Sequence, residues 1–283
     1  MNKRNLLLLI FMFLCQISFS QKQKSRFKTI AFYTNRNDRA HISFVKEANV
    51  WFPEIAKKHH FEYDTTSNWA NMNDDFLSKY QLVLFFDTRP ELPSQRLAFE
   101  RFMKNGGAWI GFHFAGFALN NSDFPQNWDW YHNEFLGVGQ YKSNTWRPVS
   151  AILKVEDMKS PFTKKIPETF SSAPNEWYRW ERNIRENKDI SVILSVDPKS
   201  FPLGTGPKLH EIWHEGDYPI AWTNKNYRML YMNMGHNDID YEQKTYKELS
   251  RQFENKIQNQ FILNVVLYLG KKSKRTVFFL KST

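Results

Sequence analysis

The segment from Gly106 to Gly116 constrains the fold of this chain more than any other part of the sequence. It reads Gly-Gly-Ala-Trp-Ile-Gly-Phe-His-Phe-Ala-Gly, which predicts the end of a helix, a short buried strand and an abrupt turn with His113 at its tip. In open α/β sheets, ligands bind just beyond the carboxyl ends of the strands. Hydrolases of this architecture carry a Ser or Cys nucleophile on such a turn. The sequence therefore predicts a scaffold suited to nucleophilic chemistry that lacks the nucleophile itself.

Strand and helix signals alternate along the first half of the chain. Continuous apolar runs, typical of strands covered on both faces, occur at Thr29–Tyr33, Gln81–Asp87 and Ala108–Phe112. Helical spacing or helix-terminal residues occur at Ile42–Lys58, which contains Pro53, and from Pro93 to Asn105-Gly106. This alternation predicts an α/β fold with a mostly parallel sheet and right-handed crossovers.

The second half of the chain has a weaker pattern. Residues 117–147 are rich in Asn, Trp and Tyr with little periodicity, and we interpret them as an irregular, aromatic-rich insertion in a single domain spanning 21–283. Further strands are expected at Val149–Val155, Ile190–Val196, Leu209–His214, Pro219–Trp222 and Arg228–Met234. A final helix is expected from Leu249 to Leu269, closed by Gly270.

Residues 1–20 have the order of a secretory signal peptide. Lys3 and Arg4 precede the apolar run Leu6–Leu14, which is too short for a stable transmembrane helix, and a small-x-small site precedes Gln21. We expect an exported protein, periplasmic or extracellular, with no transmembrane span in the mature chain. The alternative is a lipoprotein anchored through Cys15, although Phe13-Leu14 lacks the small residues usual before such a site.

Cys15 is also the only cysteine. Cleavage before Gln21 would leave a mature protein without disulfides, thiolate ligands or a cysteine nucleophile. The formal charge of +10 is spread along the chain except for the basic run Lys271–Arg275. Because an exported protein meets little nucleic acid, we expect no nucleic-acid partner and only a weak preference for anionic glycans or lipid headgroups.

Several polar side chains follow predicted strands. Asp87, His113 and His236 each come directly after an apolar run, and His41 lies just beyond the first strand. A lone histidine at a strand end is commonly structural, but the carboxyl ends of parallel strands meet at one edge, which favours a shared site. Glu176, beside Trp177 and Tyr178, is a candidate acid or base because neighbouring aromatics desolvate a carboxylate and raise its pKa.

Two other patterns have competing interpretations. His210-Glu211-Ile-Trp-His214 matches the zinc-protease motif H-E-x-x-H, which works only on a helix, whereas this segment alternates like a strand and runs into Gly216. Aromatics of the insertion, Trp128, Trp130, Tyr131 and Trp146, could stack on sugar rings or form the small core that holds the insertion.

Taken together, these motifs resemble the ThuA-like (trehalose utilisation) family of the class I glutamine amidotransferase-like superfamily, over roughly Thr29 to Gly270. The resemblance depends on the order and spacing of Gly106–His113, Trp130-Tyr131, Phe135-Leu136-Gly137, Ser160–Thr163, Asn175–Tyr178, Pro219–Trp222 and Gly235-His236. It implies a flavodoxin-like three-layer sandwich in which His113 takes the position of the amidotransferase cysteine, so no glutaminase activity is expected. Asn175 departs from the family pattern, which has an acid there, and the insertion is expanded.

We therefore predict an enzyme acting on a sugar or glycoside, with His113, Glu176 and His236 as its catalytic residues. The same three residues could hold a divalent metal such as zinc, since two imidazoles and a carboxylate are a common catalytic zinc set. Substrate-binding roles are expected for His41, Asp87, Trp130, Tyr131, Trp177 and Tyr178. The alternative is a non-catalytic carbohydrate-binding domain that uses the same side chains.

Overall fold

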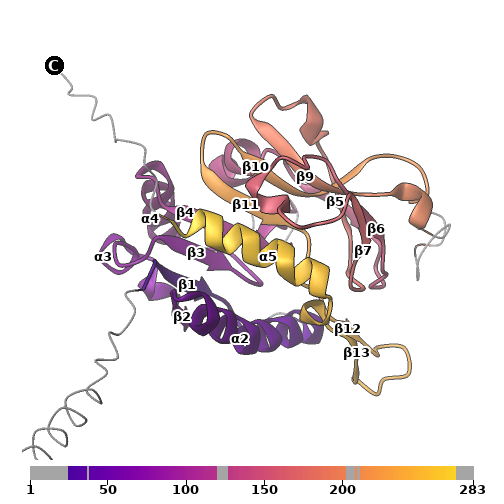
Figure 1. Cartoon of the computed structure of the whole chain (residues 1–283), viewed down its shortest axis with the longest axis horizontal. Helices are drawn as coiled ribbons and strands as arrows, with labels where there is room; N and C mark the ends of the chain where they lie inside the picture. Colours follow the sequence, from indigo (N-terminus) through magenta and orange to yellow (C-terminus); the bar gives the residue numbers. More distant parts are fainter. Residues whose placement is uncertain (1–24, 37, 120–126, 202–207, 209–210, 272–283) are drawn as a thin grey trace, which may run out of the picture.

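A nine-stranded mixed sheet forms the centre of the molecule (Figure 1). The computed structural model describes residues 25–36, 38–119, 127–201, 208 and 211–271, so the predicted signal peptide, Cys15 and residues 272–275 of the basic run lie outside it. In spatial order the strands are β2 (Glu62–Thr66), β1 (Lys28–Phe32), β3 (Leu82–Phe85), β4 (Ala108–Phe112), β11 (Arg228–Met232), β10 (Tyr218–Asn224), β9 (Ile190–Val196), β6 (Ile152–Val155) and β7 (Thr169–Ser171).

The sheet has a parallel half and an antiparallel half. Strands β2, β1, β3, β4 and β11 are parallel, and β11 enters beside β4 although more than a hundred residues separate the two strands in sequence. Strands β10, β9, β6 and β7 extend the sheet with antiparallel pairing. This confirms the predicted α/β class with a parallel centre and adds an antiparallel extension, which includes β7, a strand that the sequence pattern did not indicate.

Helices cover both faces of the parallel half and form a three-layer sandwich (Figure 1). Helices α2 (Arg39–His59) and α5 (Lys256–Leu269) pack on one face, whereas α3 (Asp74–Leu77), α4 (Pro93–Lys104) and the π-helix η3 (Trp130–Phe135) pack on the other. Short 3₁₀ turns are η1 (Trp69–Asn71), η2 (His113–Gly116), η4 (Pro161–Thr163), η5 (Ile184–Glu186), η6 (Pro198–Ser200) and η7 (Gln252–Glu254). Two small ribbons pair β5 (Tyr141–Asn144) with β8 (Tyr178–Trp180), and β12 (Asp238–Ile239) with β13 (Glu248–Ser250).

Strands β3 and β4 are apolar at every position because both of their faces are covered. In β4, Ile110 and Phe112 point into the core beneath α2 and α5, and Trp109 points into the core beneath α4 and η3. Alternate side chains of a strand lie on opposite faces, so a strand inside a three-layer sandwich needs apolar residues in both registers. This explains why the run Ala108–Phe112 was recognisable as a strand with its bounds unchanged.

The ends of the helices follow their capping residues. Asp38 caps α2 by accepting hydrogen bonds from the backbone N–H groups of Ala40 and His41, and Pro93 occupies the first turn of α4. The prediction that the final helix begins at Leu249 is wrong. The side chain of Asn255 caps α5 and starts it at Lys256, while Leu249 lies in β13.

The predicted strand Leu209–His214 is also wrong in its described part, residues 211–214, which is irregular. Residues 209 and 210 lie outside the described residues. The next strand along the chain, β10, is already paired with β9 and β11, so it offers no free edge to residues 211–214. Instead, the Trp213 ring packs under the Arg179 guanidinium, 4.1 Å from the ring centre. Because residues 211–214 are not helical, the H-E-x-x-H interpretation has no helix to support it.

In the part of the chain that the structure describes, no helix combines the length and the apolar character required to cross a bilayer.

Candidate functional site at the carboxyl edge of the sheet

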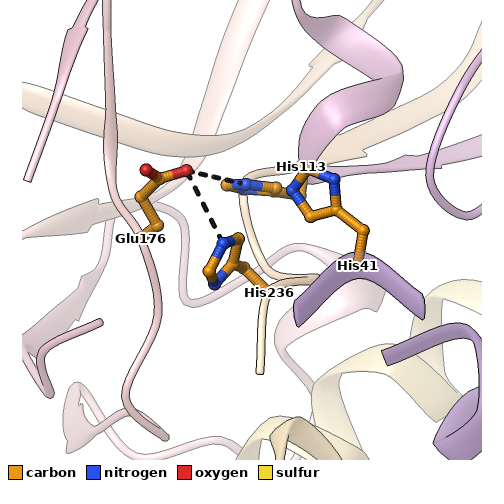
Figure 2. Close-up of side chains that lie close together, drawn as sticks. All are labelled: His41, His113, Glu176 and His236. Carbon is orange, nitrogen blue, oxygen red and sulfur yellow. Dashed lines mark ion pairs between the residues drawn. The ribbon is translucent and has the colours of Figure 1, made fainter. Parts of the chain in front are cut away.

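Four buried side chains from distant parts of the chain meet beyond the carboxyl ends of the central strands (Figure 2). His113 follows β4, His236 follows β11, His41 lies in the first turn of α2, and Glu176 precedes β8. One ligand atom from each residue lies within 4.8 Å of the others. The convergence expected from a parallel sheet therefore brings together three of the predicted strand-end residues and the Glu176 loop.

The turn after β4 holds His113 in a conformation that is rare for residues other than glycine. Its φ is 42°, in the left-handed region, and it begins the turn η2. Tyr231 of β11 donates a hydrogen bond to the His113 carbonyl at 2.7 Å, and Tyr131 of η3 donates to the Ala115 carbonyl at 2.9 Å. Backbone strain of about 1–3 kcal/mol persists only where the surroundings enforce it. The two tyrosine hydroxyls supply part of that support.

Gly235 lets the chain leaving β11 pass directly against this turn. Its φ is 141°, and a Cβ there would lie 3.0 Å from the Cβ of His113 and 3.1 Å from that of Phe112. No other residue fits this backbone conformation and this spacing without displacing the turn. The glycine is therefore what allows His236 to stand beside His113.

Asn175 and Asn233 connect the three segments that carry His113, Glu176 and His236. The Asn175 amide donates to the Asn233 carbonyl at 2.6 Å, and its oxygen accepts from the backbone N–H groups of Gly235 and His236, both at 3.2 Å. The Asn233 side-chain oxygen accepts from the Tyr178 backbone N–H at 2.7 Å. Asn175 uses a donor and an acceptor at once, which a carboxylate could not do.

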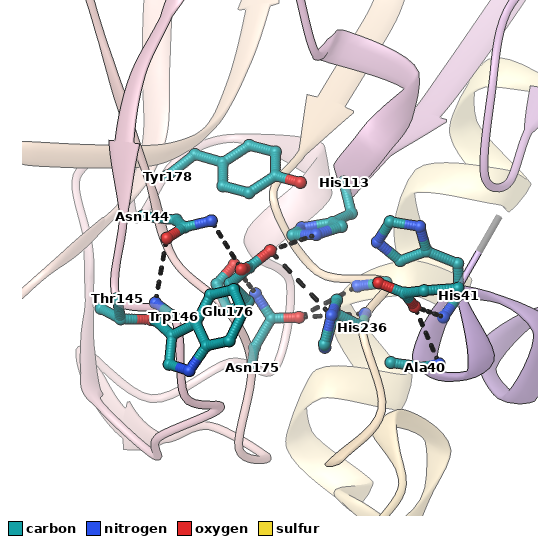
Figure 3. A network of polar contacts seen from close by, with 12 residues as sticks. Ala40, His41, His113, Asn144, Thr145, Trp146, Asn175, Glu176, Tyr178 and His236 are labelled. Carbon is teal, nitrogen blue, oxygen red and sulfur yellow. Dashed lines mark hydrogen bonds and ion pairs between the residues drawn. The ribbon is translucent and has the colours of Figure 1, made fainter. Parts of the chain in front are cut away.

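Glu176 lies between a polar rim and the imidazoles (Figure 3). Its Oε1 accepts a 2.6 Å hydrogen bond from the Asn144 side chain, which Lys208 contacts in turn at 2.6 Å. Its Oε2 lies 3.3 Å from His113 Nε2 and 4.0 Å from His236 Nε2. One carboxylate oxygen is thus fixed by the protein and the other faces the histidines.

Burial shifts the pKa of each of the four groups in the direction that favours its neutral form. It lowers the pKa of His41 to about 4, with the Asp38 carboxylate opposing the effect. Burial and the charge of His236 lower the pKa of His113 well below its usual value. Burial also lowers the pKa of His236, although the negative charge of Glu176 opposes this shift. Burial also raises the pKa of Glu176, which His236 opposes. The imidazoles therefore favour the neutral form, in which a ring nitrogen keeps a lone pair.

His41 adds a third imidazole. Its ring centre lies 5.2 Å from that of His113 and 5.0 Å from that of His236. Both of its ring nitrogens are buried, and among the described residues neither has a hydrogen-bond partner. Buried polar atoms left in this state are destabilising by about 1–3 kcal/mol each, so an unpartnered pair is unusual.

The other predicted site residues lie in different surroundings. Tyr178 stands against the site, with its ring centre 4.2 Å from that of His113, whereas Trp177 points into the core and donates to the Val149 carbonyl. Trp130 and Tyr131 are core residues of η3, so their sugar-stacking role stays a prediction that no exposed ring face supports. Asp87 is outside the four-residue cluster; its Oδ1 accepts from the Thr34 backbone N–H at 2.8 Å.

Sequence reasoning missed the polar residues that organise the cluster and the aromatic surface beside it. Asn144 could not be found, since its contact with Glu176 exists only because β5 pairs with β8; Asn233, a polar residue at the end of an apolar strand, offered a usable signal. Partly exposed Phe114, Phe117 and Tyr141 continue the ring contacts outward from His41 and Tyr178.

A hollow of about 1200 Å³ lies elsewhere on the protein. Its lining includes Gln81, Gly107 and Arg228, which stand at the amino ends of β3, β4 and β11. It is therefore at the opposite edge of the sheet from the four-residue cluster. Because ligands of open α/β sheets bind beyond the carboxyl ends of the strands, the buried four-residue cluster is the better candidate for the functional site.

The fold and the cluster place the chain among three-layer α/β proteins with a polar residue on the turn that follows a central strand. A family model described as ThuA, trehalose utilisation, matches residues 29–252. The chain belongs to the ThuA family, which is related to carbohydrate utilisation, as the sequence motifs suggested.

Solved structures agree with this assignment. A ThuA-like protein of Bacteroides uniformis ATCC 8492 is 34% identical, with a TM-score of 0.78, over 89% of this chain and 94% of that chain. A ThuA-like protein of Parabacteroides merdae ATCC 43184 shares the fold at 17% identity and a TM-score of 0.61, over 89% and 93% of the two chains. A β-galactosidase of Bacillus circulans sp. alkalophilus, 12% identical with a TM-score of 0.50, shares the fold over 88% of this chain and 32% of that enzyme. The comparison with curated proteins gave no match.

Gly235→Ala should destabilise the protein by about 1–3 kcal/mol, since a non-glycine residue at this φ is strained and its Cβ would press on the His113 turn. Gly106→Ala is the matched control, because Gly106 also has a positive φ, 84°, but nothing lies within 4 Å of its added Cβ. Chemical denaturation measures both free energies of unfolding. Equal losses in the two variants would show that the close approach to His113 contributes nothing.

Burial raises the pKa of the Asp87 carboxyl to about 8, against the Thr34 N–H that lowers it. The unfolded carboxyl titrates near about 3.9, so the native state binds the extra proton and its stability falls as the pH rises from about 4 to 8. Asp87→Asn keeps the acceptor for Thr34 but cannot ionise. Its free energy of unfolding relative to wild type should therefore increase between about pH 5 and pH 8. Asp75→Asn, at an exposed position, is the control; parallel profiles for wild type and Asp87→Asn would contradict the prediction.

Proposed function

We propose that this protein is an exported enzyme that acts on a sugar or glycoside, with Glu176 as its general acid or base. The observation that carries the proposal is the position of Glu176: a carboxyl whose side chain is 10% exposed, with one oxygen fixed by Asn144 and the other directed at two imidazoles. Burial raises its pKa, which brings a carboxyl closer to the range in which it can both take up and release a proton.

The surroundings of Glu176 suit a carbohydrate. Trp146 is 56% exposed, and its backbone N–H donates to the same Asn144 side chain that holds Glu176. Sugars offer apolar C–H faces to aromatic rings and hydroxyl groups to polar side chains. Trp146 would supply a stacking surface, and Asn144 and Lys208 would supply hydrogen bonds to hydroxyls.

His113 supports a chemistry different from that of the amidotransferases. By the resemblance of the sequence motifs, it occupies the turn that carries a nucleophilic cysteine in the amidotransferases, and its imidazole, between Asn233 and Glu176, is positioned to move protons or to polarise an oxygen. We therefore infer that the protein has no glutaminase activity.

Glu176→Gln should lower turnover by about 100- to 10,000-fold, the usual contribution of a general acid or base, while substrate binding is retained. The substitution keeps an oxygen for Asn144 and removes the ionisable group. Initial rates on a panel of glycosides, keto-sugars and trehalose, with calorimetric binding in parallel, separate kcat from affinity.

Glu211→Gln is the matched control, because Glu211 belongs to the H-E-x-x-H segment and contacts Trp213 rather than the cluster. Its turnover should equal that of wild type. Binding without turnover in the wild type, unchanged in Glu176→Gln, would identify the protein as a carbohydrate-binding domain. If the wild-type protein neither binds nor turns over any compound of the panel, both functions are rejected.

We also propose that the protein is exported. The charged, apolar and small-x-small order of residues 1–20 supports cleavage after Ser20. Amino-terminal sequencing of the protein recovered outside the cytoplasm should begin at Gln21. Recovery from the cytoplasm with Met1 in place would contradict export, and a lipid on Cys15 would replace cleavage before Gln21 with membrane anchoring.

A further inference from the structure

We propose that His41, His113, His236 and Glu176 form a binding site for one divalent first-row transition-metal ion. The inference deepens the proposed function, since it concerns the same cluster, but it is tested by metal binding alone. It differs from the set suggested by sequence in having His41 as a fourth ligand.

The first argument is the donor set. Three imidazoles and one carboxylate offer ligand atoms within 4.8 Å of one another, from four segments that are far apart in the sequence. Metal–ligand bonds of about 2.0–2.1 Å place tetrahedral ligand atoms about 3.3 Å apart, and His113 Nε2 already lies 3.3 Å from Glu176 Oε2. Imidazole suits zinc, copper, iron and nickel, whereas magnesium and calcium prefer oxygen ligands only.

The second argument is electrostatic. His113 Nδ1 faces both the Asn233 carbonyl, an acceptor at 3.3 Å, and the Asn233 side-chain amide at 3.1 Å. In the tautomer that donates to the carbonyl, Nε2 presents a lone pair to the lone pairs of Glu176 Oε2. Two acceptors at this distance repel each other unless a cation or a proton lies between them. A bound cation would remove the repulsion in that tautomer.

The third argument is the state of His41. Its two ring nitrogens find no partner within the described part of the chain, yet its ring lies beside those of His113 and His236 (Figure 2). Asp38 caps α2 at the His41 backbone N–H and fixes the first turn from which the ring projects. A metal bond to one nitrogen would give a partner to a buried polar atom that otherwise destabilises the folded protein by about 1–3 kcal/mol.

A bound ion would also explain why four buried side chains meet at the site of the proposed sugar-processing activity. A first-row ion can accept further ligands besides the four from the protein, and adjacent sugar oxygens are suitable ones. Bound in this way, a hydroxyl or carbonyl oxygen would be polarised by the ion, which would supply Lewis-acid chemistry at the site. The ligand class is therefore a polyhydroxylated or keto-sugar that chelates through neighbouring oxygens.

The test uses the purified full chain, stripped of metal and then titrated separately with Zn²⁺, Mn²⁺, Co²⁺ and Ni²⁺ by calorimetry. At least one of these ions should bind with a stoichiometry of one per chain. His41→Gln, His113→Gln, His236→Gln and Glu176→Gln should each weaken binding by more than about 100-fold, because loss of a supporting residue alone changes metal affinity by about 10- to 100-fold. The visible spectrum of the Co²⁺ form reports whether the remaining ligands change geometry.

His214→Gln is the matched control, since His214 belongs to the H-E-x-x-H segment and pairs with Glu215, outside the cluster. Its affinity should equal that of wild type. Absence of stoichiometric binding by all four ions, or unchanged affinity in His41→Gln with its thermal unfolding intact, would overturn the proposal. Metal binding without sugar turnover would instead reject the proposed function, and full turnover by metal-free protein would reject the catalytic role of the ion.

Discussion

The site depends on the parallel pairing of β4 with β11. These strands are far apart in the sequence, and their register puts Phe112 opposite Met232, so the chain leaves both strands at the same level of the sheet. His113 and Gly235 then occupy one small volume, which is possible because one residue accepts a left-handed backbone and the other has no side chain. Every other member of the cluster is placed relative to this crossing.

Hydrogen bonds of Asn175 and Asn233 hold the Glu176 segment against the end of β11. The Asn175 amide donates to the Asn233 carbonyl, and the Asn233 side-chain oxygen accepts from the Tyr178 backbone N–H, in an environment with little access to water. Hydrogen bonds of this kind strengthen in a low dielectric and become a liability when one partner is missing. The same low dielectric discourages charge on the histidines, so the structural network and the chemistry of the imidazoles have one physical origin.

The sequence predicted the elements that are determined by residues within or next to the element itself. Strands β4 and β9 were found with their bounds unchanged. Strand β4 is covered on both faces and therefore apolar throughout, and Gly106 marks the preceding helix end, whereas β9 was recognised by its alternating apolar residues. Asp38 and Asn255 set the starts of α2 and α5, and both signals were overlooked, so the first helix was predicted to begin at Ile42 instead of Arg39. His41, His113 and His236 were identified as strand-end residues, whereas Asn144 was not, because its role arises only after β5 and β8 pair.

The amide at position 175 has a consequence for how this family can vary. Where a relative carries an acid at this position, the oxygen can still receive the N–H groups of residues 235 and 236, but nothing remains to donate to the carbonyl of residue 233. That carbonyl is then available to another donor, of which the imidazole on the strand turn is the nearest described here, at 3.3 Å. Exchanging Asn175 for an acid would thereby favour the His113 tautomer that carries its proton on Nδ1. A substitution two residues before the core residue Trp177 would then change the basicity of a ring with which it has no direct contact.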